Sequence, residues 1–240
     1  MAKKPYTVVC HTSNYKLWTE ERKNSIGASD QVGEALFLTK TGQKESFTGN
    51  RYSFWGQQLE EPIIRGLQKW SGLRTRPSGF LLRSTERPHM SATLDGLAAL
   101  PTTEHGQEKF QRYLEMDLGL SPEKQIDYKS MKGLAVLEIK ALGNNRIPEF
   151  VDFTQKYNKT LLFWSTSLKK VKFPAPKHYY DQVQQQLYVT GLDMGWLAVL
   201  LAGQTVLLYP IERNEDVIKK RCEECDSIWE KIRAYREQSA

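Results

Sequence analysis

The hydrophobic residues of this 240-residue chain follow two spacings, one typical of helices and one typical of strands. Apolar residues three or four positions apart predict amphipathic helices at residues 25–38, 54–70, 179–192 and 213–238. Ser25 or Ser29 is suited to cap the first helix, and Pro62 either kinks the second or marks where it begins again. The inward side of this second helix is expected to carry Leu59, Ile63, Leu67 and Trp70.

Runs of branched and aromatic residues predict strands between these helices. Residues 79–100 read as two strands joined by a turn at Glu86–Pro88, and 196–211 as two strands around an Ala-Gly-Gln-Thr turn. Residues 101–132 are polar and irregular, with a short helix start at Pro122 and Glu123, and are interpreted as an insertion. Helices on both sides of a central set of strands predict one α/β domain over residues 1–240, which ends in the helix at about 213–238.

A further strand is predicted at residues 136–142, VLEIKAL, where a glutamate and a lysine interrupt an apolar run. Side chains alternate along a strand, so Glu138 and Lys140 share one face while Leu137 and Ile139 point to the other. The two charges are compatible with the wet face of an antiparallel strand or with a solvated ion pair worth at most about 1 kcal/mol. They are also compatible with half of a metal-dependent active site.

Composition limits the classes of protein to consider. The chain has 34 Lys and Arg against 28 Asp and Glu, a net charge of +6, which is compatible with a polyanionic partner. The N-terminus lacks the apolar region of a signal peptide, and the longest apolar stretch, at 196–203, is far shorter than a membrane span. Three cysteines are too few for a disulfide framework. We therefore expect a soluble protein of the cytoplasm.

Three carboxylates lie where an acidic side chain is costly. Asp95 follows an apolar strand, Glu138 lies inside one, and Glu60 is on a helix beside its apolar face. Taken singly, an Asp-Gly pair is more often a turn, and a helix glutamate is usually solvated. Together they are the hard oxygen ligands that Mg²⁺ requires, and Lys140 is placed to orient a water or stabilise a charged transition state. The sequence leaves open whether Glu60 or Glu61 faces the site.

The order of these residues resembles the PD-(D/E)XK nuclease superfamily: a helix glutamate, then Asp95 at a strand end, then Glu138-Ile139-Lys140. The flanking blocks narrow the resemblance to the YqaJ-like viral recombinases, the group that contains phage lambda exonuclease. These blocks are RKNSIGASD, WGQQLEEP, TLDGL, LEIK and DQVQQQLYVTG, and they span about residues 15–211. The implied fold is a restriction-endonuclease-like core, a central mixed β-sheet with helices on both faces.

The resemblance also implies roles for individual residues. Glu60, Asp95, Glu138 and the backbone carbonyl of Ile139 would bind the metal. Lys140 would position or activate the attacking water, and Gln182 matches the family's helix glutamine near that water. Gln184 and Tyr188 form a Q-x-x-x-Y pattern found in relatives, so the choice between Gln182 and Gln184 stays open, as does the simpler interpretation of a glutamine-rich helix surface.

Arg22 and Ser29 match positions that hold a 5′-terminal phosphate in the family, and Thr93 could add a hydroxyl. Chemistry supports this assignment independently, because a helix start at residues 26–29 would offer free backbone N–H groups and Arg22 a forked donor. The simpler interpretation is an ordinary helix cap beside a surface arginine. Basic residues at 65–87 and basic and aromatic residues at 141–178 add candidate DNA contacts, with solvated loops as the alternative.

Some relatives bind an iron–sulfur cluster through one early and three late cysteines. Here Cys10 is early, but only Cys222 and Cys225 are late, and both fall on the apolar stripe of the last helix. One ligand is therefore missing, and we interpret these two as core residues. The four histidines show no metal-ligand spacing and are not expected to take part in catalysis.

The resemblance thus implies a Mg²⁺-dependent 5′→3′ exodeoxyribonuclease, with Mn²⁺ as a possible substitute. Its substrate would be linear double-stranded DNA with 5′ phosphates, and its product a 3′ single-stranded overhang for recombination. A homotrimer and a single-strand annealing partner are expected from the same resemblance. The alternatives are an endonuclease of the same superfamily and a non-catalytic DNA-binding module.

Overall fold

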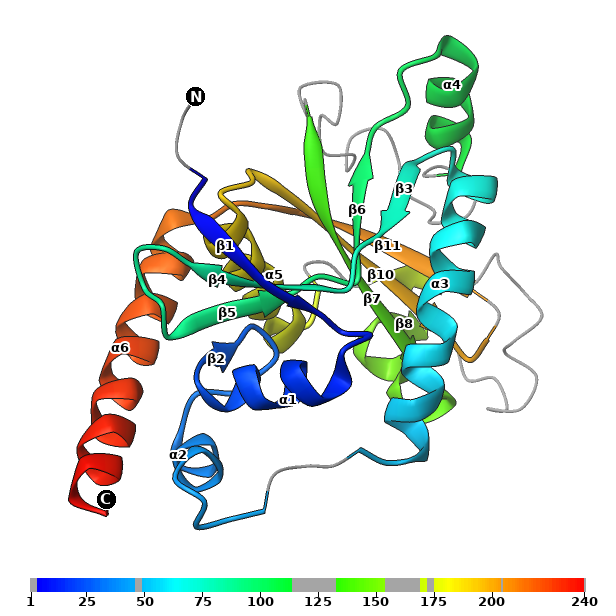
Figure 1. Ribbon diagram of the computed structural model, residues 1–240. Coiled ribbons are helices and arrows are strands. Elements are labelled where there is room, and N and C mark those ends of the chain that lie inside the picture. Colours follow the sequence, from blue (N-terminus) through cyan, green and yellow to red (C-terminus); the bar gives the residue numbers. More distant parts are fainter. Residues whose placement is uncertain are drawn as a thin grey trace.

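The computed structural model describes residues 4–45, 49–113, 133–153, 169–171, 175–203 and 205–239. Within these residues the chain forms a five-stranded sheet, a four-stranded sheet and a two-stranded ribbon, with helices packed around them (Figure 1). We call the five-stranded sheet the central sheet and the four-stranded sheet the N-terminal sheet. The predicted fold class, an α/β core built on mixed sheets, is confirmed.

The central sheet is mixed, with β7 in its middle. Its strands, in spatial order, are β11 (Thr205–Glu212), β10 (Met194–Leu201), β7 (Leu134–Leu142), β6 (Gly96–Ala99) and β3 (Arg74–Pro77). β7 and β10 run parallel, and the other neighbouring pairs are antiparallel. The central place of β7 explains its apolar sequence, since such a strand has protein on both sides.

The N-terminal sheet is also mixed and lies beside the central one. Its strands, in spatial order, are β1 (Tyr6–His11), β4 (Phe80–Ser84), β5 (Met90–Thr93) and β2 (Ile26–Gly27). β4 and β5 form the predicted antiparallel hairpin, and β2 joins β5 in parallel. The ribbon pairs β8 (Val151–Phe153) with β9 (Lys169–Val171).

Helices cover both faces of the central sheet. The helices of the described chain are α1 (Tyr15–Lys23), α2 (Glu34–Lys40), α3 (Arg51–Ser71), α4 (Glu104–Arg112), α5 (Lys177–Thr190) and α6 (Glu215–Gln238), with a short 3₁₀ helix at Asn144–Glu149. A Cβ placed on Gly96 would meet α3 at 3.3 Å, and one on Gly195 would meet α5 at 2.5 Å. Gly96 pairs with Leu137 and Gly195 with Val136, which are neighbours along β7, so α3 and α5 lie on opposite faces.

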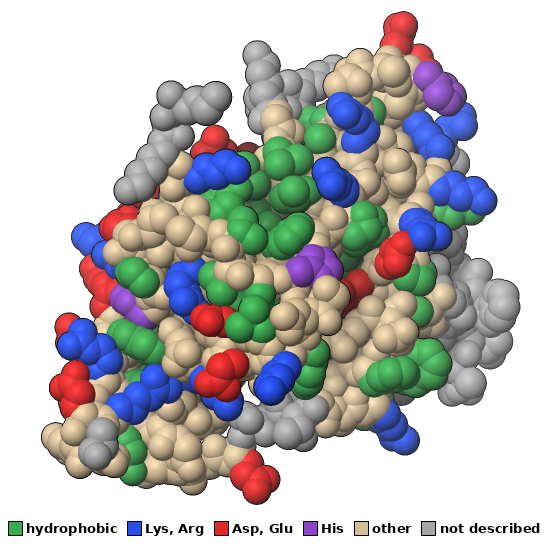
Figure 2. All heavy atoms as spheres, in the orientation of Figure 1, with side chains coloured by type: hydrophobic (Ala, Val, Ile, Leu, Met, Phe, Trp, Pro, Cys, Tyr) green, Lys and Arg blue, Asp and Glu red, His purple; other side chains and the backbone are tan. Residues whose placement is uncertain are grey.

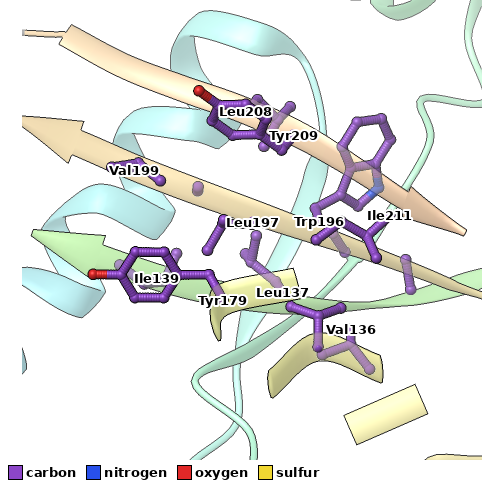
Figure 3. Packing of buried hydrophobic residues seen from close by; sticks show 14 of the residues in the cluster. Val136, Leu137, Ile139, Tyr179, Trp196, Leu197, Val199, Leu208, Tyr209 and Ile211 are labelled. Carbon is purple, nitrogen blue, oxygen red and sulfur yellow. The ribbon is translucent and has the colours of Figure 1, made fainter. Parts of the chain in front are cut away.

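The main core fills the space between the central sheet and these helices (Figure 3). Val136, Leu137 and Ile139 of β7, Leu197 of β10 and Tyr209 of β11 are all buried. A second cluster lies under α6 and joins it to α2 and the N-terminal sheet. Its buried members are Ile26, Leu36, Met90, Ile218, Cys222, Cys225, Ile228 and Ile232.

The helices predicted at 179–192 and 213–238 are confirmed as α5 and α6, and the strand pair at 196–211 as β10 and β11. The prediction for 54–70 is confirmed as α3, a continuous helix in which Pro62 is an interior residue. Trp70 was expected to face inward and is 67% exposed, which is a correction. The second of the two strands predicted within residues 79–100 is divided in the structure into β5 and β6, and α4 was not predicted. The insertion at 101–132 lies partly outside the described residues.

The predicted helix at 25–38 is wrong over its first half. Ile26 and Gly27 form β2 instead, with the Ile26 N–H donating to the His89 carbonyl at 2.6 Å. The Asp30 carboxylate accepts a hydrogen bond from the Gly27 N–H at 2.9 Å, which holds a turn after the strand. The helix begins only at Glu34 and is capped by Gly33 without a side-chain bond, so neither Ser25 nor Ser29 caps it.

Candidate functional site

A cleft of about 480 Å³ opens where the two sheets meet α1, α3 and α5. Every side chain that the sequence predicted for the site lines this one cleft, namely Arg22, Ser29, Glu60, Thr93, Asp95, Glu138, Lys140 and Gln182. They come from segments that lie far apart in the sequence. The fold therefore brings together the two predicted groups, the carboxylates with the lysine and the phosphate-binding residues.

Glu138 lies at the bottom of the cleft and is only 1% exposed. Lys140, its neighbour on the same face of β7, donates a hydrogen bond to Glu138 Oε1. The amides of two α5 residues complete its surroundings: Gln182 donates to Oε1 at 2.6 Å and Gln186 to Oε2 at 2.5 Å. A buried carboxylate with both oxygens hydrogen-bonded is held in one orientation, so the direction of its oxygens is set.

Asp95 lies between β5 and β6, where the chain crosses from the N-terminal sheet to the central sheet. Its Oδ2 accepts a hydrogen bond from the backbone N–H of Ile139 at 2.8 Å. This bond fixes the aspartate beside the Glu138–Lys140 segment of β7. Ile139 itself is not among the residues that line the cleft, so its carbonyl remains a predicted ligand.

Burial and neighbouring negative charge raise the pKa of Glu60 and of Asp95. Burial and the nearby charge of Glu138 raise the pKa of Glu60 from 4.5 to about 7, against the opposing effect of Lys140. The same causes, with Glu60 as a further negative neighbour, hold the pKa of Asp95 well above its usual range. Burial tends to lower the pKa of Lys140, but Glu138 and Asp95 outweigh it, so this pKa is raised and the lysine stays protonated.

The donor set fits a divalent metal in its chemistry. Three carboxylates facing one cleft carry more negative charge than a single lysine balances, and hard oxygen atoms are the ligands that Mg²⁺ and Mn²⁺ prefer. Within the described part of the chain, no three Asp, Glu, His or Cys side chains already stand close enough together to hold a metal ion. Lys140 and Gln182 both donate to Glu138 Oε1, so this oxygen must exchange partners before it can bind a metal.

Arg22 and Ser29 form the other end of the cleft. Arg22 Nη2 donates to Asp30 Oδ1 at 2.8 Å and to Ser29 Oγ at 3.4 Å, and its guanidinium carbon lies 5.1 Å from the Trp18 ring centre. Trp18 Nε1 in turn donates to Thr93 Oγ1 at 3.1 Å. The arginine is thus held against an aromatic face and an acid, with about a third of its side chain exposed to the cleft.

The predicted reason for this anion site needs a correction. Residues 26–29 are not a helix start, and the Gly27 N–H that would have faced an anion is bonded to Asp30. Lys40 of α2 donates to the carbonyls of Arg22 and Ser25 at 2.5 and 2.7 Å, which holds the connection between α1 and β2. The cationic group available here is therefore the Arg22 side chain, and the backbone dipole argument does not apply.

The sequence left open two choices between nearby residues, and in each case the structure places only one of the two in the cleft. Gln182 bonds to Glu138, whereas Gln184 Nε2 donates to the Glu212 carbonyl at 2.7 Å, away from the cleft. Glu60 lines the cleft, whereas Glu61 pairs with Arg65 at the surface of α3. Within the described residues, Gln182 and Glu60 are thus the members of each pair that lie in the site.

Sequence reasoning missed His11 and Trp18, which line the cleft, and Gln186, which donates a hydrogen bond to Glu138. Gln186 had a usable signal, because Gln182 and Gln186 are four residues apart and share a helix face, whereas Gln184 does not. His11 bonds Ser13 and the Ser78 carbonyl at the cleft wall. Its position depends on pairing of β1 with β4, which no local pattern indicates.

The run of basic residues at 65–87 does not form one surface. Arg83 pairs with Glu21, and Arg87 with Glu86 and Asp226, so these two tie the fold together. Arg74 and Arg76 remain exposed. Much of the basic and aromatic segment 141–178 lies outside the described residues.

The two late cysteines are core residues, as predicted. Cys222 and Cys225 are 5% and 0% exposed and pack in the second cluster. Burial raises the pKa of both thiols, that of Cys225 to about 12. Cys10 is half-buried on β1.

The mixed central sheet, with an aspartate at a strand end and Glu-x-Lys on the next strand facing a cleft, defines a restriction-endonuclease-like protein. The model of the YqaJ-like viral recombinase domain matches residues 7–193. The chain therefore belongs to the YqaJ-like viral recombinase family, as the resemblance predicted. Among curated proteins no significant match is found.

The solved structures of one alkaline exonuclease show the same fold. An alkaline exonuclease from Laribacter hongkongensis is 16% identical, with a TM-score of 0.58 over 93% of this chain and 95% of that one. Its complex with dAMP matches equally well. A phage-related exonuclease from Haemophilus somnus 129PT is 12% identical, with a TM-score of 0.49 over 85% of this chain and 81% of that one. In the described residues, no helix has the length and apolar character needed to cross a membrane.

Proposed function

We propose that this protein is a Mg²⁺-dependent 5′→3′ exodeoxyribonuclease that acts on linear double-stranded DNA and leaves a 3′ single-stranded overhang for recombination by strand annealing. The observation that carries the proposal is the convergence of Glu60, Asp95, Glu138 and Lys140 with Arg22 in one cleft. A reacting phosphodiester and a terminal 5′ phosphate need these two groups of residues at a short, fixed separation. Membership of a recombinase family supports the link to recombination.

The chain's own residues account for much of the chemistry. Lys140 is protonated at neutral pH, so it stabilises negative charge on the phosphate and is not a general base while it is paired with Glu138. Gln182, bonded to the same oxygen, orients groups next to it. A divalent cation held by Glu60, Asp95 and Glu138 would supply Lewis-acid stabilisation and an activated water.

Arg22 gives the proposal its directionality. A guanidinium fork pairs well with a phosphate that carries two negative charges, so a 5′-phosphorylated end should bind better than a 5′-hydroxyl end. An endonuclease of the same fold would not need such a group, and a non-catalytic module would not need the carboxylates. By family resemblance we also propose a homotrimer, a single-strand annealing partner and a cytoplasmic location. Residues 1–240 would form a single domain.

The test is a digestion of three DNAs with Mg²⁺: linear duplex with 5′ phosphate, linear duplex with 5′ hydroxyl, and closed circle. Lys140→Ala is the loss variant, and Lys219→Ala, an exposed lysine on α6, is the matched control. We expect rapid loss of the phosphorylated linear duplex only, abolished by Lys140→Ala and by EDTA but kept in Lys219→Ala. A nicked or linearised circle would make it an endonuclease, and intact DNA in every lane would favour a binding module.

A further inference from the structure

Part of the central sheet next to the cleft is covered only partly by protein. On this part the side chains of β3, β6 and β7 that point away from α3 are Arg74, Arg76, Leu97, Ala99 and Leu134, which we call the Arg74/Arg76 face. Strand register places them together: Arg76 pairs with Leu97, and Leu97 pairs with Val136. Paired residues point to the same side of a sheet, so these side chains share the side of Glu138, two residues beyond Val136.

The Arg74/Arg76 face is continuous with the cleft. β6 begins immediately after Asp95, and β3 leads into Gly79, and both residues line the cleft. β7 runs from Leu134 to Glu138 in the same direction as β3. At about 3.3 Å per residue, the level of Arg76 is about 7 Å from that of Asp95 and the level of Arg74 about 13 Å. The face is therefore a short track that leads out of the cleft.

The track is positively charged on one side and apolar along its floor. Arg74 and Arg76 are exposed, and among the described residues neither forms an ion pair. Leu134 is 48% exposed, and Leu97 and Ala99 are half-buried. Figure 2 shows hydrophobic side chains gathered over β6 and β7, with Lys or Arg side chains beside them over β3. Between Arg74 and the cleft, the described residues of these strands put no carboxylate on this side.

These features fit one strand of DNA better than a duplex. Arg74 and Arg76 are two residues apart on a strand, about 6.8 Å, which is of the order of the spacing between neighbouring phosphates. The exposed parts of Leu134 and Leu97 can pack against the faces of unpaired bases, which a duplex does not offer because its bases are stacked on one another. At the cleft end, Phe80 adds an aromatic ring that is 44% exposed and packs edge-on against His11, at 4.9 Å between ring centres.

We propose that the Arg74/Arg76 face binds single-stranded DNA, with phosphates on the two arginines and bases against the leucines. This inference rests on the proposed function: the bound DNA would be the 3′ strand, which the enzyme does not cut. The Arg74/Arg76 face would then be the place where that strand leaves the site. Contacts to successive phosphates would keep the end of the duplex at the cleft between cuts. The face then contributes to affinity and to the number of cuts per encounter, while the carboxylates carry out hydrolysis.

The experiment measures binding of a fluorescent oligothymidylate without a 5′ phosphate, by anisotropy in EDTA, over a range of salt concentrations. Wild type is compared with Arg74→Ala/Arg76→Ala and with Leu134→Ser. Arg233→Ala/Lys231→Ala, two exposed cations on α6, is the matched control. We expect the arginine variant to bind about tenfold more weakly and to lower the slope of log K against log salt by about 1.4, which corresponds to two phosphate contacts on a single strand. Leu134→Ser should weaken binding and leave the slope unchanged.

Unchanged affinity and slope in the arginine variant, with an unchanged melting temperature, would overturn the inference. A changed oligomeric state in Leu134→Ser, measured by light scattering, together with unchanged DNA affinity, would make the face an interface between copies and would also overturn it. Because binding is measured in EDTA, the outcome is separate from that of the digestion. Arginine-dependent binding by a protein that cuts no DNA would reject the nuclease and keep this site.

Discussion

At the scale of single residues, the hydrogen bonds to the Glu138 carboxylate determine the geometry of the site. One carboxylate at 1% exposure accepts hydrogen bonds from Lys140, Gln182 and Gln186, and two further acids face the same cleft. Each neighbour has a different relation to it: the lysine balances its charge, the glutamines set its direction, and Glu60 and Asp95 have raised pKa values because of burial and the charge of Glu138. Changes to single residues should therefore separate charge from orientation.

Gln186 is expected to be a positioning residue for Glu138. Its Nε2 donates to Glu138 Oε2, and in Gln186→Ala this buried oxygen loses its partner, at a cost of about 1–3 kcal/mol of unfolding free energy. DNA hydrolysis should fall about 10- to 100-fold, and the rise in melting temperature caused by Mn²⁺ should shrink. Gln58→Ala, at an exposed position of α3, is the control. Equal Mn²⁺ responses in wild type and Gln186→Ala would contradict this role.

Metal-free stability should depend on pH through Glu60. Its pKa is raised from 4.5 to about 7 in the folded state, so between these values the folded protein holds more protons than the unfolded chain. The unfolding free energy should therefore fall as pH rises from about 4.5 to 7, by about 1–2 kcal/mol from Glu60 after allowing for its partial exposure. Urea unfolding in EDTA measures this slope. Glu60→Gln should reduce it, and an identical slope in that variant would show that the glutamate is not perturbed.

At the scale of elements, β7 and α5 act as a pair. β7 supplies Glu138 and Lys140, and α5 supplies the glutamines, so the distance between strand and helix sets the geometry of the site. Gly195 of the adjacent strand allows this close approach, since a Cβ there would lie 2.5 Å from Val183 of α5. Gly195 therefore sets the distance between the sheet and α5 at the candidate site, in addition to its role in packing.

Gly195→Ala should push α5 away from the sheet. We expect a loss of about 1–3 kcal/mol of unfolding free energy from overpacking, together with weaker Mn²⁺ binding because Gln182 and Gln186 move with the helix. Gly56→Ala is the matched control, since a Cβ at this helical position has nothing within 4 Å. It should stabilise the protein by about 0.5–1 kcal/mol. Chemical denaturation of both variants tests the contrast, and equal effects would contradict it.

At the scale of the whole molecule, the cleft joins the two sheets. Arg22 lies on α1 beside the N-terminal sheet, Glu138 on the central sheet, and Asp95 on the crossing between them. A cation bound by Glu60, Asp95 and Glu138 would connect α3, this crossing and β7. Removal of the metal should therefore change the unfolding free energy of the whole protein.

Mn²⁺ or Mg²⁺ at 100 times its dissociation constant should raise the unfolding free energy by about 2.7 kcal/mol, because the unfolded chain lacks the site. For a domain of this size that corresponds to a rise in melting temperature of about 5–10 °C, reversed by EDTA. Asp95→Asn should abolish most of the rise. Differential scanning calorimetry makes the measurement, and a full rise in Asp95→Asn would place the metal elsewhere.

Much of the architecture and the site was available from local patterns. The strand at 136–142 could be recognised because its branched residues are continuous, and α3, α5 and α6 because their apolar residues repeat at helical spacing. The carboxylates and Lys140 could be identified as candidates because a charge inside an apolar segment is costly to bury. Charged residues at such positions therefore indicate a function. Glu138 is a particular example. Its position inside the apolar strand β7 means that it is buried, and a buried carboxylate requires a partner such as Lys140.

Only the tertiary structure decided what depends on distant contacts. Ile26 and Gly27 became a strand because β5 offered them hydrogen-bond partners, and no signal within residues 25–38 contains that information. The choice of Gln182 over Gln184 depended on where α5 meets β7, and the Arg74/Arg76 face depended on register across three strands. The sequence by itself determined the type and chemistry of the elements, because these follow from local periodicity and desolvation. Their mutual placement came from packing and pairing between segments far apart in the chain.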